Sequence, residues 1–94
     1  MTSLHSGFAA EAALADDMVI VTTTITPANN PSLPDTRSDA IPLSSLTGSR
    51  HDRRSAIEGS IKSTWGAILA DSLVDEAVRA VETGLSTNNV SFGN

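Results

Sequence analysis

The sequence predicts a mainly α-helical chain that also carries one β-strand and an extended arm. Three observations lead to this fold class: helix start and stop signals around residues 55–84, a β-branched run at 19–26, and the placement of all four prolines within 27–50. A chain of 94 residues allows one small domain with a modest core. We divide it into a short helix plus strand, an arm, a helical unit and a polar tail, at residues 1–26, 27–54, 55–85 and 86–94.

The first expected element is a short helix over residues 6–17, "SGFAAEAALADD", which is rich in alanine. Two to three turns are marginal in isolation, so this helix needs support from the rest of the chain. The strand follows at about 18–26, where "VIVTTTIT" places eight β-branched residues in a row. Such residues favour a strand because a helix restricts their χ1 rotation.

This strand lacks an obvious partner within the chain. The segment "AIPL" is interrupted by Pro42, and "VSF" near the C-terminus has only three residues. Pairing with another chain, a weak internal hairpin and packing on the helices are therefore all open. The intervening residues, 27–50, combine the prolines with many Ser, Asn and Asp residues, which is typical of an extended linker or arm.

The C-terminal half carries the clearest helix signals. "SAIE" matches a capping box, which predicts a helix start at about Ser55. "TGL" places Gly84 where a left-handed residue closes a helix, so the helix should end near Thr83.

The apolar residues of this half form two stripes on nearly opposite sides of one ideal helix. The first stripe contains Ile57, Ile61, Trp65 and Ile68, and the second contains Val74, Ala77, Val78, Val81 and Leu85. Either the helix breaks near Asp71 into helices of about 55–70 and 72–84, or one long helix contacts different partners along its halves. We favour the break, because Gly66 and the polar Asp71–Ser72 pair weaken helix continuity.

No motif supports an enzyme. His51 stands beside Asp52, but a general base needs an orienting partner and a nucleophile in space rather than in sequence. The chain has no cysteine and two distant histidines, which lack metal-ligand spacing, and it has no glycine-rich phosphate loop. We therefore expect neither catalysis nor a cofactor or metal.

Half of the chain's six Lys and Arg residues lie at Arg50, Arg53 and Arg54. This cluster is a candidate contact for phosphate or an acidic protein patch, and the alternative is a solvated loop whose arginines pair with Asp52 or Glu58. The net charge of −5 and the presence of only three aromatic residues disfavour nucleic acid as a partner beyond this local cluster.

We expect a non-enzymatic interaction or assembly protein, for example a small structural subunit of a larger complex such as a virion. It would self-associate or bind a protein partner through its helical unit, with the strand and arm ordering on that partner. The candidate partner-binding residues are Trp65, Ile68, Leu69, Leu73, Val74, Val78 and Val81, with Val19, Val21 and Ile25 from the strand. No secretion signal is visible, so we expect a cytoplasmic protein or one held within a virion or large assembly.

Two alternative functions remain open. The first is a protein whose amphipathic helix lies in a membrane interface, although the acidic polar face of residues 55–85 differs from the basic face usual in such helices. The second is a small enzyme regulator.

Overall fold

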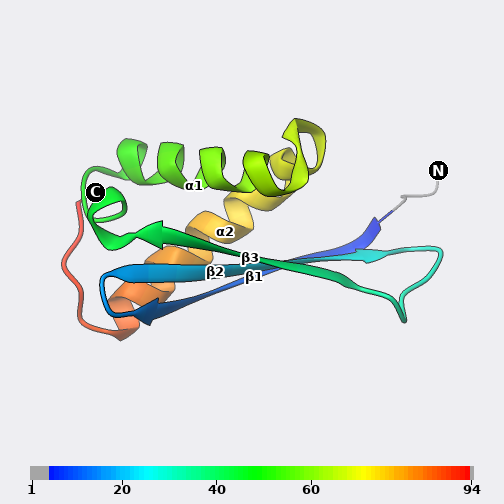
Figure 1. The fold of residues 1–94 in the computed structure, drawn as a ribbon, viewed down its shortest axis with the longest axis horizontal. Coiled ribbons are helices and arrows are strands. Elements are labelled where there is room, and N and C mark those ends of the chain that lie inside the picture. The colour runs from blue at the N-terminus through cyan, green and yellow to red at the C-terminus, as the bar shows by residue number, and fades with distance from the viewer. Residues whose placement is uncertain (1–4, 94) are drawn as a thin grey trace.

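The computed structural model describes residues 5–93 and has an α+β fold, in which a three-stranded antiparallel sheet is followed by two helices (Figure 1). The prediction of a mainly α chain is therefore wrong. The elements in order are β1 (His5–Ala15), β2 (Met18–Pro27), β3 (Asp35–Pro42), the short 3-10 helix η1 (Leu43–Ser45), α1 (Arg50–Trp65) and α2 (Ala67–Thr87).

The sheet is a meander in the order β1-β2-β3. A two-residue turn joins the first two strands, with Ala15 opposite Met18 and a positive φ of 56° at Asp16, as mirror-image hairpin turns require. The predicted strand at about 18–26 is confirmed as β2. Its partners lie within the chain on both sides, so the β-branched run is the central strand of the sheet.

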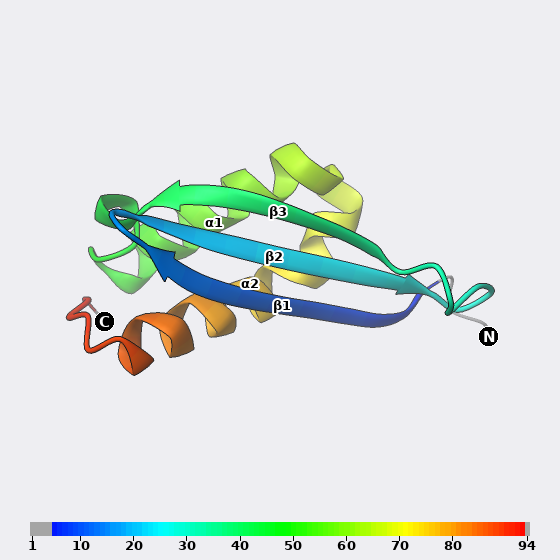
Figure 2. The ribbon, with the colours of Figure 1, turned by 60° about the horizontal axis from the view of Figure 1, so that its bottom comes forward.

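Both helices cover the same face of this sheet, and Figure 2 shows the opposite face without a helix. α2 packs mainly on β1, whereas α1 packs beside β3. Along β2, residues alternate between half-buried and buried, and the buried set on the helix side is Val19, Val21, Thr23 and Ile25. The core therefore lies between one face of the sheet and a pair of helices.

The alanine-rich segment expected as a helix over 6–17 is instead the edge strand β1. Phe8, Ala10, Ala12 and Leu14 face the helices and pack against the core. A Cβ atom at Gly84 of α2 would lie 3.1 Å from the carbonyl oxygen of Ala12, so small residues on both elements permit this close packing. Pairing with β2 and contact with α2 outweigh the helix propensity of alanine.

The expected arm contains the third strand. β3 has one buried apolar residue, Ile41, and its other residues are exposed or half-buried and mostly polar, so its sequence resembles a loop. It pairs with β2 over its whole length, and Pro42 lies at its end, where a missing N–H disrupts little. The prediction of an extended arm is wrong for residues 35–42 and for the part of α1 that begins at Arg50.

α1 begins earlier than the capping-box match at Ser55 predicts. Its N-cap is Ser49, whose hydroxyl accepts a hydrogen bond of 3.1 Å from the Asp52 amide. The chain does turn between two helices, but at Gly66 rather than near Asp71. Gly66 adopts φ 87° and ψ 158°, a region that other residues rarely occupy.

α2 continues beyond the predicted stop near Thr83. It ends at Thr87 in a Schellman motif, in which the Val90 amide donates to the Leu85 carbonyl at 2.9 Å and the Asn89 amide to the Ser86 carbonyl at 3.1 Å. Asn89, with φ 60°, occupies the left-handed position that we had assigned to Gly84. Gly84 is instead a helical residue that faces β1.

The turn at Gly66 explains the two apolar stripes. Each helix is rotated independently about its axis, so both stripes face the same sheet, except Ile68, which lies beyond the turn and is exposed. The buried residues are Arg53, Ile57, Ile61 and Trp65 in α1, and Ala70, Leu73, Val74, Ala77, Val78, Val81 and Leu85 in α2.

Candidate interaction surfaces

Most of the predicted partner-binding residues lie inside this chain's own core. The buried ones are Val19, Val21, Ile25, Trp65, Leu73, Val74, Val78 and Val81. Leu69 is half-buried, and Ile68, in the first turn of α2, is 90% exposed. The sheet therefore covers most of the apolar helix surface for which the sequence showed no partner.

Trp65 joins three elements. Its indole N–H donates to the Thr23 hydroxyl at 2.7 Å, and that hydroxyl donates to the Arg37 carbonyl at 3.3 Å. The Arg37 guanidinium lies 4.2 Å from the centre of the indole ring and donates to the Thr64 carbonyl at 2.7 Å. These contacts make Trp65 an anchor between α1 and the sheet.

Arg53 is a structural residue at the start of α1. It is 1% exposed, and its guanidinium forms an ion pair with Glu82 at 2.8 Å. It also donates to the carbonyl oxygens of Leu46 at 3.3 Å and Gly48 at 3.2 Å, and it lies 4.6 Å from the centre of the Phe92 ring. Arg53 therefore holds the loop before α1, α2 and the C-terminal segment together.

The other two arginines of the cluster point outward. Arg54 forms an exposed ion pair with Asp75 at 2.8 Å, and Glu58 pairs with Lys62 at 3.3 Å. Across residues 5–93, Arg50 has no ion pair within the chain. Contact with phosphate or an acidic patch therefore stays a prediction. Only Arg50 and Arg54 of the cluster could make this contact without disrupting the core.

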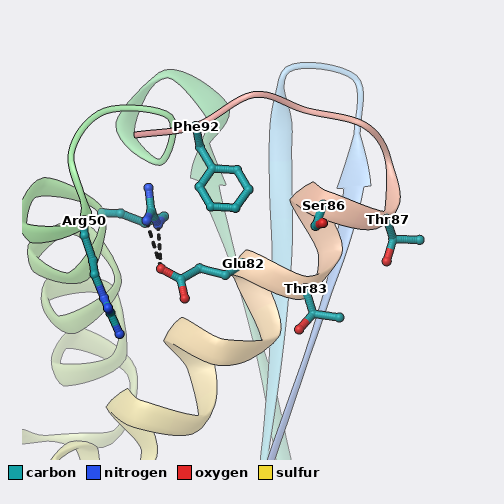
Figure 3. Close-up of a pocket in the computed structure, with 7 residues that line it drawn as sticks. Arg50, Glu82, Thr83, Ser86, Thr87 and Phe92 are labelled. Atoms are coloured by element: carbon teal, nitrogen blue, oxygen red, sulfur yellow. Dashed lines mark hydrogen bonds and ion pairs between the residues drawn. The ribbon is translucent and has the colours of Figure 1, made fainter. Parts of the chain in front are cut away.

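A cleft of about 510 Å³ lies between the start of α1, the end of α2 and the C-terminal segment (Figure 3). Its lining combines the guanidinium of Arg50, the Arg53–Glu82 pair, three hydroxyls and an aromatic ring, from Arg50, Arg53, Glu82, Thr83, Ser86, Thr87 and Phe92. Glu82 already accepts from Arg53, and no histidine or cysteine lines the cleft. The arrangement provides polar contacts but no activated nucleophile.

The outer face of the sheet is not covered by the helices (Figure 2). Among residues 7–93, its single charged side chain is Glu11. Two pairs of hydroxyls bond across the strands, Thr22 with Ser38 at 3.1 Å and Thr24 with Thr36 at 3.0 Å. Strand pairing and alternation define its members as Ala9, Glu11, Ala13, Ala15, Met18, Ile20, Thr22, Thr24, Thr26, Thr36, Ser38, Ala40 and Pro42.

The outer face is apolar at one end and rich in hydroxyls at the other. The apolar end lies next to the β1–β2 turn, where the cross-strand sets are Ala13, Ile20 and Ala40, then Ala15, Met18 and Pro42. Sequence reasoning missed this face because in "VIVTTTIT" every residue is β-branched, which hides the alternation between buried and open positions. Residues 9–15 give no alternation either, because Ala10 and Ala12 on the buried side lie between the alanines of the outer face.

Comparison with known proteins gives no match: no family model, curated protein or solved structure resembles this chain. Within residues 5–93, no group of three or more His, Asp or Glu side chains is placed to hold a metal ion. In the same part of the chain, neither helix has the length and apolarity needed to cross a bilayer. The surfaces themselves are therefore the basis for a functional proposal.

Proposed function

We propose that this chain is a non-enzymatic assembly subunit that packs against a second copy of itself through the outer face of its sheet. The observation that carries the proposal is that this face has one charged residue, Glu11, although the chain as a whole has 17. Protein surfaces that stay in water are usually richer in charge, and depletion of charged residues is typical of interface cores.

The chemistry of the face lowers the cost of covering it. Its four central hydroxyls already bond to one another in pairs, so burial leaves few polar groups without a partner. Small side chains allow a second sheet to approach at the usual spacing of about 10 Å, and the end around Ile20 supplies apolar area.

Size predicts weak association. Three strands of eight residues span roughly 26 Å by 14 Å, so a sheet-on-sheet contact covers about 700 Å² over both copies, which is below the about 1,000 Å² usual for a specific, stable interface. We therefore expect a dimer that forms and dissociates with concentration. A subunit of a larger assembly, such as a virion, needs a second surface besides this one.

The test is the mass in solution, measured by light scattering over a concentration range up to about 1 mM. We expect the mass of the wild-type chain to rise toward that of a dimer and the Ile20→Lys variant to stay monomeric, because a charge in the apolar end of the contact must be desolvated. Ile68→Lys is the matched control, since Ile68 is exposed but lies off the face.

Circular dichroism on the same samples shows whether each variant is folded. A wild-type chain that is monomeric at every concentration would contradict the proposal. Loss of association in Ile68→Lys but not in Ile20→Lys would move the contact to the start of α2 and would also overturn it.

A further inference from the structure

The open edge of β1 presents unused backbone groups. Across residues 5–93, β1 pairs with β2 only, so its other side has no strand. The Leu43 amide donates to the Asp17 carbonyl at 2.8 Å, in register with the β2–β3 ladder, so odd-numbered residues of β2 direct their backbone groups toward β3 and even-numbered ones toward β1. Because antiparallel pairing alternates, the backbone groups of Ala10, Ala12 and Leu14 point away from β2.

A groove of about 460 Å³ runs beside this edge, between β1 and α2. Its wall is residues 10–12, and its floor includes Glu76, Arg79, Ala80 and Thr83 of α2. Gly84 brings α2 against the carbonyl of Ala12, which fixes the helix next to the strand. An added strand would thus have the outward backbone groups of Ala10 and Leu14 and the Ala12 amide on one side, with the Ala12 carbonyl held against α2, and a helix surface beneath it.

The edge of β1 also lacks the features that protect an edge strand. β1 contains no proline or lysine, and Glu11 is its one carboxylate. The opposite edge, β3, carries Asp35, Arg37 and Asp39 and ends at Pro42, which are the devices that proteins use against unwanted pairing. The two edges therefore differ in the way expected when one of them is used for binding.

We infer that the groove between β1 and α2 binds an extended segment of a partner polypeptide, which joins the sheet as a fourth strand. This mode of recognition takes affinity from main-chain hydrogen bonds and specificity from alternate side chains. Side chains that face Ala80 and Gly84 must be small or β-branched. This groove shares only Glu11 with the outer face, and strand addition uses the edge of β1 rather than that face, so the inference does not depend on self-association.

Charge defines one further feature of the partner. Glu76 forms an ion pair with Arg79 at 3.2 Å, whereas Glu11 has no ion pair within residues 5–93. A lysine or arginine in the bound segment would therefore lie opposite Glu11, in keeping with the net charge of −5.

The probe is a phage-displayed library of random peptides of about ten residues, selected on the immobilised full chain. We expect enriched peptides with alternating small or β-branched residues and a Lys or Arg. The tightest peptide, made synthetically, should bind the Ala80→Arg variant about tenfold more weakly than it binds wild type. Its affinity for Ser72→Arg, an exposed change on the same helix, should equal its affinity for wild type.

Two further measurements separate strand addition from other binding. Methylating the peptide's backbone nitrogens at every second residue should abolish binding when the methylated set is the one that faces β1, and should leave binding unchanged when it is the other set. The Ala10 and Ala12 amides should exchange with solvent more slowly in the complex. Glu11→Lys, an exposed change, should weaken binding even if Ala80→Arg does not fold.

Failure to enrich any peptide over a blank surface would overturn the inference. So would binding that is insensitive to both groove variants, or amide protection that falls on the outer-face residues of β3. None of these results bears on self-association, which the Ile20→Lys variant tests separately.

Discussion

At the scale of single residues, the two buried polar side chains among residues 7–93 decide how the elements are joined. Thr23 and Arg53 are both nearly inaccessible, and each bonds to elements far away in sequence. Arginine is rarely buried without a partner, and the partner of Arg53 is Glu82, on the second helix. The sequence shows a basic cluster before a helix but not this pairing, so the internal role of Arg53 could not be predicted from it.

Replacing Arg53 should be far more costly than replacing its neighbour. In Arg53→Ala, Glu82 and the carbonyls of Leu46 and Gly48 lose their donor, which should lower the free energy of unfolding by about 3 kcal/mol. The control is Arg54→Ala, whose exposed ion pair with Asp75 should be worth less than about 1 kcal/mol. Urea denaturation measures both, and equal losses would contradict the structural role of Arg53.

The hydrogen bond from Trp65 gives a second residue-scale prediction. Thr23→Val keeps the shape of the side chain but leaves the buried indole N–H without an acceptor, at an expected cost of about 1–3 kcal/mol. Thr22→Val removes a hydroxyl on the open side of the same strand and should change stability by less than about 0.5 kcal/mol. Thermal unfolding of the two variants would refute this account if both melted at the same temperature.

At the scale of elements, the helices and strands that could be predicted are those whose own residues carry the pattern of that element. β2 follows from its β-branched run, and the two-helix arrangement from the displaced apolar stripes. β1 and β3 were missed because what makes them strands is their pairing with β2, not their composition. The ends of the helices were misplaced because Ser55 and Gly84, although suited to caps, lie within helices whose length is set by contact with the sheet.

The turn between the helices depends on one glycine. Gly66→Ala places a Cβ on a backbone with φ 87° and ψ 158°, which should cost roughly 1–3 kcal/mol although no atom lies within 4 Å of it. Gly59→Ala, in the interior of α1 and equally uncrowded, should instead stabilise the chain by about 0.5–1 kcal/mol. Denaturant titrations should show that the free energy of unfolding falls in Gly66→Ala and rises in Gly59→Ala. Stabilisation by both changes would rule out strain at Gly66.

At the scale of the whole molecule, the placement of both helices on one side of the sheet creates the candidate sites. The outer face and the open edge of β1 exist only once the three strands are in register, because their members come from segments far apart in sequence. Residues chosen for their hydrophobicity, such as Val74 and Val78, fill the core instead. An interaction role could thus be anticipated from composition, whereas its surface could not.

The contact between Ala12 and Gly84 also bears on how the chain reaches its native state. β1 is made before α2, the element that covers it, and the other strands and α1 come between them in the chain. Until α2 arrives, a meander formed from β1 to β3 would leave Val19 and Val21 in water, so it should gain little stability alone. The packing of α2 on β1, which joins segments separated by most of the chain, should therefore limit the folding rate. Before that step, the nascent sheet is the form most exposed to aggregation.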